Sequence, residues 1–306
     1  MRQPVKTWST PVSTEDSRRI PCALCGGDRF RPFLSCEGFS YVKCLSCGLV
    51  QMNPQPLSEP VVRRYREAYG ADYCSYELAN EAAFLRLQQL ALADAGFDEL
   101  ERDLTLAASE RRREGEREEE GRGIERRQPR VLDVGCATGA LLEYLRERGW
   151  QVSGAEISPS AEYARVQRGL EVWSLPLEEI HLPPDYFDLI LASHLIEHLN
   201  SPASFVREAW RILRPGGRFL VTTPNIAGFQ ARLLGARWRS AIFDHLYLFS
   251  ARTLKPLLAN AGFTIEGVYT WGGIASGLAP PPLKKCIDRA AKGLGIGDVM
   301  LVRSQK

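Results

Sequence analysis

The sequence lacks any long hydrophobic run: no stretch approaches 18 uninterrupted apolar residues, so we predict no membrane span. Its first 19 residues lack the apolar core of a secretory signal, and we therefore expect a cytoplasmic protein. An excess of one charge is also missing, because 39 basic and 37 acidic residues leave a net charge of +2. With no global field to attract phosphates, we do not expect nucleic acid as a partner.

Half of the cysteines in the sequence are regularly spaced. Eight cysteines occur, and four of them form two Cys-x-x-Cys pairs, Cys22 with Cys25 and Cys44 with Cys47. In a chain expected inside the cell, this spacing favours a metal over disulfides. Four thiolates close a tetrahedral Zn²⁺ site, so we predict a structural zinc ribbon over residues 20–56. The alternatives are buried reduced thiols or a redox pair, and Cys36 is either a small apolar residue or a spare ligand.

The segments on either side of this ribbon differ in composition. Residues 1–19 are polar, rich in Ser, Thr and Pro, and predict a flexible tail. Residues 57–108 carry apolar positions at three- and four-residue spacing, which predicts helices. Residues 109–128 are dense in Arg and Glu and bury almost nothing. They predict a flexible linker, with a solvated helix laced by ion pairs as the alternative.

The segment from Pro129 to Trp150 predicts a ligand site. A short apolar run ends at Asp133, a loop carries Gly135 and Gly139, and leucines then follow at helical spacing. Such a strand, glycine turn and helix let a ligand approach the backbone and the N–H groups of the helix N-terminus. The next predicted strand ends in Glu156, which is placed to accept hydrogen bonds from a ribose diol.

Later segments follow the same alternation of strands and helices, which predicts an α/β fold. We predict strands at Arg130–Val134, Gln151–Glu156, Leu170–Ser174, Phe187–Ser193, Gly217–Thr223, Phe263–Trp271 and Val299–Arg303, and helices at Ala140–Arg148, Ala161–Arg168, Pro202–Leu213 and Ala251–Ala261.

Four motifs carry a resemblance to a known family. The sequences DVGCATG, Glu156, FDLILASHLIEHL and LRPGGRFLVTTPN resemble, in order, the motifs of the class I S-adenosylmethionine-dependent methyltransferases. One departure is Ala137, where the family often has a glycine. The resemblance implies a Rossmann-like seven-stranded sheet, with its last strand antiparallel and helices on both faces. It also implies a methyltransferase catalytic domain at 129–306 and makes the helices of 57–108 a lid over the cofactor.

The resemblance also implies a set of residues that bind S-adenosylmethionine. The loop after the first strand should line the methionine side, Glu156 should hold the ribose and the loop after the third strand should meet the adenine. The expected set is Asp133, Gly135, Cys136, Ala137, Gly139, Glu156, Ile157, Leu175, Ser193 and His194.

Two histidines are candidate catalytic residues. By resemblance, His194 touches both cofactor and acceptor, either in the reaction or as steric packing. His245 lies in a segment that resembles the WxxxxxxHLxxFSxxTL pattern of a bacterial subgroup linked to sugar or polyketide tailoring. A histidine of pKa near 6.5 could act there as a general base, or it could be a structural hydrogen bonder. Asp244 could orient His245.

The acceptor is the least defined part of the prediction. Arg232, Arg237 and Arg239 flank Trp238, and arginine forks with a stacking face suit an anionic acceptor. We expect O- or C-methylation of a small or carrier-linked acceptor such as a sugar, lipid or polyketide-related compound. The alternatives are an RNA methyltransferase whose ribbon grips nucleic acid, and an inactive scaffold with a methyltransferase fold.

Overall fold

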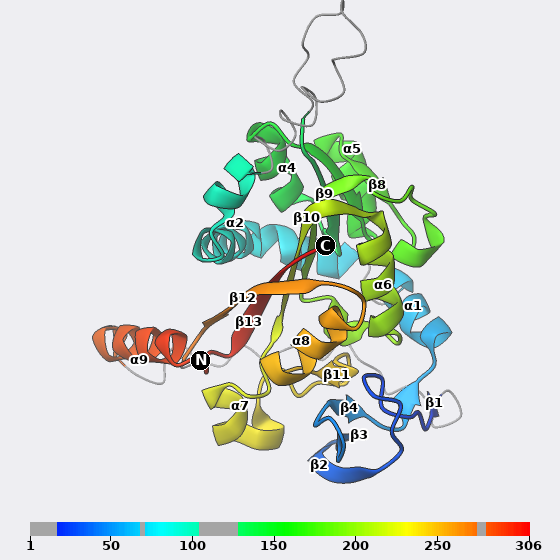
Figure 1. Cartoon of the computed structure of the whole chain (residues 1–306), viewed down its shortest axis with the longest axis vertical. Coiled ribbons are helices and arrows are strands. Elements are labelled where there is room, and N and C mark those ends of the chain that lie inside the picture. Colours follow the sequence, from blue (N-terminus) through cyan, green and yellow to red (C-terminus); the bar gives the residue numbers. More distant parts are fainter. Residues whose placement is uncertain (1–16, 68–70, 104–127, 274–279) are drawn as a thin grey trace, which may run out of the picture.

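The computed structural model describes residues 17–67, 71–103, 128–273 and 280–306 (Figure 1). Nearly all of the predicted linker, 109–128, and most of the predicted tail, 1–19, lie outside these ranges. Among the described residues, no helix has both the length and the apolar character that crossing a bilayer requires.

The centre of the molecule is a seven-stranded sheet with the order β12-β13-β10-β9-β6-β7-β8. Strand β13 runs antiparallel to both of its neighbours, while the other pairings in the sheet are parallel. Its strands are β6 (Arg130–Val134), β7 (Gln151–Ala155), β8 (Glu171–Trp173), β9 (Phe187–Ser193), β10 (Leu213–Pro224), β12 (Thr264–Trp271) and β13 (Val299–Gln305). The predicted Rossmann-like class, with a final antiparallel strand, is confirmed.

Helices cover both faces of this sheet because its buried strands are apolar on both sides. Leu141 and Leu145 of α4 pack with Val131 on one face, whereas Phe205 and Val206 of α6 join the core cluster of the other face. The helices of this domain are α4 (Ala140–Glu147), α5 (Ser160–Arg168), α6 (Pro202–Ile212), α7 (Phe229–Leu234), α8 (Ala251–Ala259) and α9 (Pro281–Gly293). Helices α7 and α9 were not predicted, although α9 begins with the proline pair that often starts a helix.

The cysteine-containing segment forms its own small sheet, drawn in blue beside α8 in Figure 1. Its strands are β2 (Phe30–Cys36), β3 (Phe39–Cys44) and β4 (Val50–Met52). A fourth strand, β11 (Tyr247–Leu248), comes from the large domain and pairs antiparallel with β4. Strand β1 (Ser17–Arg18), at the end of the predicted tail, pairs with β5 (Gln55–Pro56).

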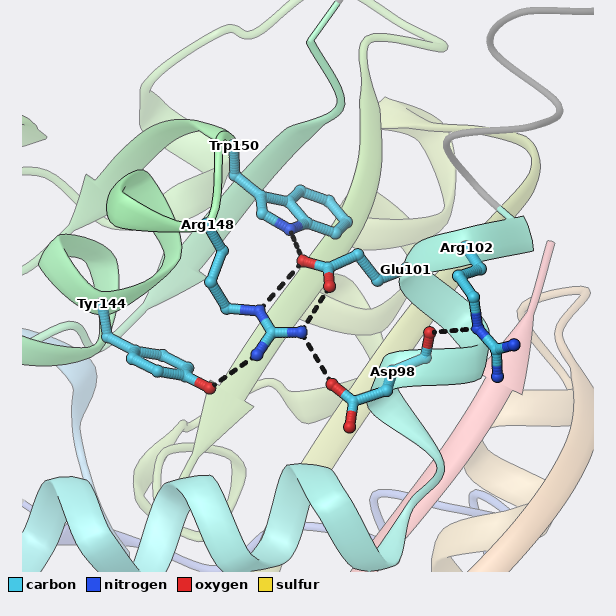
Figure 2. Close-up of polar contacts among 6 residues, drawn as sticks. All are labelled: Asp98, Glu101, Arg102, Tyr144, Arg148 and Trp150. Atoms are coloured by element: carbon cyan, nitrogen blue, oxygen red, sulfur yellow. Dashed lines mark hydrogen bonds and ion pairs between the residues drawn. The ribbon is translucent and has the colours of Figure 1, made fainter.

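The segment between the two sheets is helical, as its apolar spacing predicts. It contains α1 (Ser58–Glu67), α2 (Ala71–Asp94) and a further helical stretch at 97–103. Figure 2 shows how this last stretch is anchored: Arg148, just after α4, pairs with Glu101 and Asp98. The Trp150 indole N–H also donates to Glu101, at 2.7 Å. These contacts hold the end of the helical segment against the first βαβ unit of the main sheet.

Candidate active site

A cavity of about 920 Å³ opens at the carboxyl ends of the central strands. This is the edge where ligands bind in doubly wound sheets. Its walls come from the glycine loop after β6, the ends of β7 and β9, helix α2 and helix α9. The predicted donor-site residues among its lining are Gly135, Cys136, Ala137, Glu156, Ser193 and His194. The cavity therefore joins the glycine loop, the acidic end of β7 and the end of β9 in one space.

The glycine loop needs its glycines for two different reasons. Gly135 and Gly139 both have positive φ, at 80° and 82°, where a side chain is strained. At Gly139 a Cβ would also lie 2.5 Å from the Leu170 side chain, so the turn could not pack against α5 and β8. Ala137, at the place where the resembling family often has glycine, also has positive φ, at 51°. The loop keeps its conformation there at a cost of about 1 kcal/mol.

Glu156 lies directly after β7 and faces this loop. The N–H of Ala137 donates to its Oε2 at 3.0 Å, and the N–H of Ser158 donates to its Oε1 at 2.8 Å. Each carboxylate oxygen can accept a further hydrogen bond. The Glu156 carboxylate is thus oriented toward the loop and still able to accept hydroxyl donors from a ligand.

Two acids, the buried Asp133 and the half-buried Glu156, share this end of the sheet. Burial, together with the nearby charge of Glu156, raises the pKa of Asp133 to about 7. Burial also raises the pKa of Glu156, against the opposing effect of its backbone donors. Asp133 is 2% exposed and does not itself line the cavity. A buried acid that is half-protonated at neutral pH makes the site less negative than its sequence suggests.

Helix α2 closes one side of the cavity through acidic side chains that sequence reasoning missed. Thr138 of the glycine loop donates its hydroxyl to Glu81, and Ser160 of α5 donates to Glu77, both at 3.0 Å. Glu81 also pairs with Arg168 at 2.5 Å. Their signal in the sequence was weak, because glutamates on a predicted helix are usually solvent-facing.

The remaining predicted donor-site residues lie around the cavity rather than in its lining. Gly139 forms the turn into α4, and Ile157 is half-buried beside Glu156. Leu175 is 40% exposed in the loop after β8. These three residues are close to the lining residues and would lie near a bound ligand, but none of them lines the cavity.

The end of β9 brings three histidines and a buried glutamate together. His194 is half-exposed, lines the cavity and has positive φ, at 52°. Its Nδ1 lies 3.4 Å from Oε1 of Glu197, a side chain that is 1% exposed. The rings of His198 and His245 stand edge to face, with centroids 4.7 Å apart. Burial opposes ionisation of Glu197, yet the three histidines lower its pKa to about 2.

The predicted general base His245 is buried within the protein. It is 7% exposed and is not part of the cavity lining. Burial, and then the neighbouring His198, lower its pKa to about 3, so it is neutral and weakly basic at pH 7. Its Nδ1 lies 2.8 Å from the carbonyl oxygen of Ser240. His245 is therefore a buried, neutral imidazole next to His198.

The predicted cluster of arginines and tryptophan is also arranged differently. Trp238 is 2% exposed and donates its indole N–H to Asp298 at 2.5 Å, so it offers no stacking face to a ligand. Arg239 pairs with the same Asp298 at 2.7 Å and lines the cavity. Arg232 and Arg237 are exposed and do not line it. Lysine and arginine residues of α9 add positive charge to the cavity wall, namely Lys285, Arg289 and Lys292.

The four cysteines predicted as metal ligands meet in one place. All four sulfur atoms lie within 4.8 Å of one another. The sulfurs of Cys22 and Cys47 are 3.4 Å apart, and those of Cys25 and Cys44 are 3.6 Å apart. A tetrahedral Zn²⁺ with Zn–S bonds of about 2.3 Å separates its sulfurs by about 3.8 Å, so the residues fit this ion. Cys36 contacts the Ala241 carbonyl instead and is not in the group.

Thiol acidity differs within this group, because burial raises the pKa of Cys22 and of Cys47. Burial opposes ionisation of Cys44, but backbone N–H groups of Cys47 and Ser46 lower its pKa to about 6. A thiolate is the form of cysteine that binds metals.

The sheet order, the glycine loop and the acid after the second strand together define a Rossmann-like protein of the class I methyltransferase type. The family model described as "Methyltransferase domain" matches residues 92–268, more than half of the chain. The chain therefore belongs to this family, and its recognised relatives are S-adenosylmethionine-dependent methyltransferases.

Two relatives and one solved structure illustrate the similarity. A "Probable S-adenosylmethionine-dependent methyltransferase" of Mycolicibacterium smegmatis is 33% identical over 47% of this chain and 57% of its own length. A "Ubiquinone biosynthesis O-methyltransferase" of Xylella fastidiosa is 34% identical over 45% of this chain and 62% of its own length. A solved Thermotoga maritima methyltransferase is 27% identical over 59% of this chain and 83% of its own, with a TM-score of 0.48. The chain thus spans less than two thirds of the two curated relatives.

Proposed function

We propose that this chain transfers the methyl group of S-adenosylmethionine to an oxygen or carbon atom of a small or carrier-linked acceptor. The observation that carries the proposal is the cavity that joins the glycine loop, Glu156 and His194 in one space. In the transfer, the acceptor atom bonds to the methyl carbon as the sulfur–carbon bond breaks, S-adenosylhomocysteine leaves, and the proton of the acceptor atom passes to solvent. Because this is an in-line displacement, alignment of the two reactants supplies most of the catalysis.

The donor half of the proposal follows from the loop. The backbone at Gly135 would leave room for the methionine part, with Cys136 and Ala137 beside it, while Asp133 and Gly139 would support the loop from outside the cavity lining. Glu156 would accept hydrogen bonds from the ribose hydroxyls, since both of its oxygens retain accepting capacity. Ile157 and Leu175 would flank the adenosine, and Ser193 the sulfonium. His194, with its half-exposed ring in the lining, would contact both reactants.

The acceptor half follows from the charge of the cavity wall. The cavity lining carries four basic and four acidic side chains, and Arg239 and Lys292 are paired with Asp298 and Asp94. Lys285 and Arg289 of α9 favour an acceptor that carries a negative group, such as a phosphate or carboxylate. Oxygen as the acceptor atom agrees with the relatives named as O-methyltransferases. A carrier-linked or nucleotide-linked hydroxyl compound meets both conditions.

The ribbon is proposed to hold a structural Zn²⁺. Cys22, Cys25, Cys44 and Cys47 would supply four thiolates, which leaves no open position for chemistry. Reduced cysteines require a reducing compartment, so a cytoplasmic setting is part of the proposal.

The donor assignment is tested by calorimetry with S-adenosylmethionine and S-adenosylhomocysteine. We expect both to bind, and we expect Glu156→Gln to weaken binding at least tenfold because the neutral amide accepts ribose hydrogen bonds less strongly. The matched control is Glu162→Gln, since Glu162 is an exposed residue of α5. Absence of binding to the unmodified chain would refute the proposal and leave the inactive scaffold.

The acceptor is tested by a product screen with methyl-labelled donor. Pools of nucleotide sugars, phenols, carrier-linked hydroxyacyl compounds and RNA would be incubated with the full chain. We expect label in a small or carrier-linked hydroxyl compound. Label only in RNA would establish the nucleic-acid alternative instead.

A further inference from the structure

Behind His194, a second group of metal-binding side chains lies apart from the cysteines. Glu197, His198 and His245 each place one ligand atom within 4.8 Å of the others. Ligands at about 2.1 Å from a tetrahedral or octahedral ion are about 3.0 to 3.4 Å apart, so small side-chain rotations would close the group around an ion. No step of the proposed function uses these three residues.

The hydrogen bonds of both histidines leave the same ring nitrogen available. Nδ1 of His245 lies 2.8 Å from the Ser240 carbonyl oxygen, and Nδ1 of His198 lies 2.8 Å from the Asp244 carbonyl oxygen. The Tyr65 hydroxyl also lies 2.7 Å from Nδ1 of His198. Because a carbonyl can only accept, the carbonyl contacts favour a proton on Nδ1 in both rings, with the Tyr65 hydroxyl as a second acceptor at His198. Each Nε2 then keeps its lone pair. Metal-binding histidines are commonly oriented in this way, with the second nitrogen donating to a backbone carbonyl.

Glu197 supplies the negative charge of the group. Its Oε2 accepts a hydrogen bond from the Thr223 hydroxyl at 2.9 Å, while its Oε1 lies 3.4 Å from Nδ1 of His194. A carboxylate that is 1% exposed is costly to bury unless a cation compensates its charge.

We infer that Glu197, His198 and His245 form a binding site for a divalent transition-metal ion next to His194 and the cavity. Two imidazoles and one carboxylate suit Mn²⁺, Fe²⁺ or Zn²⁺, and three protein ligands leave open positions, unlike the closed set of four cysteines. Resting on the proposed function, the inference adds that an acceptor hydroxyl fills an open position. The acceptor is therefore a compound whose hydroxyl group can bind to a metal ion.

The test counts metal ions bound to the full chain. Mn²⁺ is the probe, because it prefers nitrogen and oxygen ligands and will not displace zinc from thiolates. The chain is saturated with Mn²⁺, freed of unbound metal and analysed by elemental mass spectrometry. We expect two ions per chain, one on the cysteines and one on this group. His198→Asn with His245→Asn should retain only the first, because asparagine replaces the Nδ1 donor but not Nε2.

Two further variants complete the design. Glu197→Gln keeps the volume and the Thr223 contact, and it should weaken Mn²⁺ binding at least tenfold. His181→Asn changes an exposed histidine outside the group and should retain both ions. One ion in the unmodified chain, or two in the double variant, would overturn the inference. Binding of S-adenosylhomocysteine, measured in parallel, reports separately on the proposed function.

Discussion

Ala137 and His194 hold their backbones in the left-handed region, with φ of 51° and 52°, and both line the cavity. This conformation is strained for residues other than glycine, and such strain is concentrated at functional sites. In each case the following residues lead into a turn that faces the ligand space. The strained positions therefore fix the loop after β6 and the loop after β9.

Ala137→Gly should relieve this strain. Glycine adopts positive φ without a steric penalty, although it also makes the unfolded chain more flexible. We therefore expect the free energy of unfolding to stay the same or to rise by up to about 1 kcal/mol. The matched control is Ala290→Gly on the exposed side of α9. This variant should lower the free energy of unfolding by about 1 kcal/mol. Urea unfolding measures both. A loss at Ala137 equal to that at Ala290 would contradict the strain argument.

Asp133 predicts a pH dependence of stability. Its pKa is about 7 in the folded protein and near 3.8 in the unfolded chain, so the folded state holds a proton that the unfolded state releases. The stability linked to this group is complete below pH 4 and is lost as pH rises toward 7. Asp133→Asn removes the effect. Its stability relative to the unmodified chain should rise by up to about 4 kcal/mol between pH 4 and pH 8.

The measurement is urea unfolding of the cofactor-free chain at pH 4, 6 and 8. The pH 4 values form an internal control, because the acid is then largely protonated in the folded protein. A difference between the two proteins that stays constant with pH would contradict the assignment.

At the scale of elements, alternation and periodicity predicted the main sheet closely. Strands β6 and β9 have the predicted bounds, because a short apolar run buried on both faces is read directly from sequence. Strand β11 was missed, since it has only two residues and exists because the distant β4 pairs with it. The group around Glu197 was missed for the same reason: His245 approaches His198 only through tertiary packing.

The loop that carries His245 is held by Tyr41 of β3. The Tyr41 hydroxyl lies 2.8 Å from the Ile242 carbonyl and 2.7 Å from the His245 carbonyl, and its side chain is fully buried. Tyr41→Phe leaves both carbonyls without this donor and should cost about 1 to 3 kcal/mol. Thermal unfolding measures the loss. Tyr186→Phe, which removes a half-buried hydroxyl, is the control and should cost less than 1 kcal/mol. Equal losses of stability in the two variants would show that the Tyr41 hydroxyl contributes no more than the Tyr186 hydroxyl.

At the scale of the whole molecule, the ribbon and the large domain share one core. Tyr41, Leu49 and Met52 of the ribbon belong to the same buried cluster as Leu246 and Phe249 of the large domain. Strand β11 continues the ribbon's sheet, and the N–H of Met52 donates to the Leu246 carbonyl at 2.8 Å. The ribbon is thus positioned to support the segment that leads from His245 into α8.

This sharing predicts what loss of the proposed Zn²⁺ does far from the cysteines. A ribbon of under 40 residues that holds this ion would depend on it to fold, so Cys44→Ser with Cys47→Ser should expose the shared core. Hydrogen exchange at residues 240–249 should accelerate at least tenfold, while β9, in the centre of the main sheet, stays protected. Cys286→Ser, at an exposed cysteine of α9, is the control and should leave exchange unchanged. Unaltered protection at 240–249 in the double variant would mean that the large domain holds this segment without the ribbon.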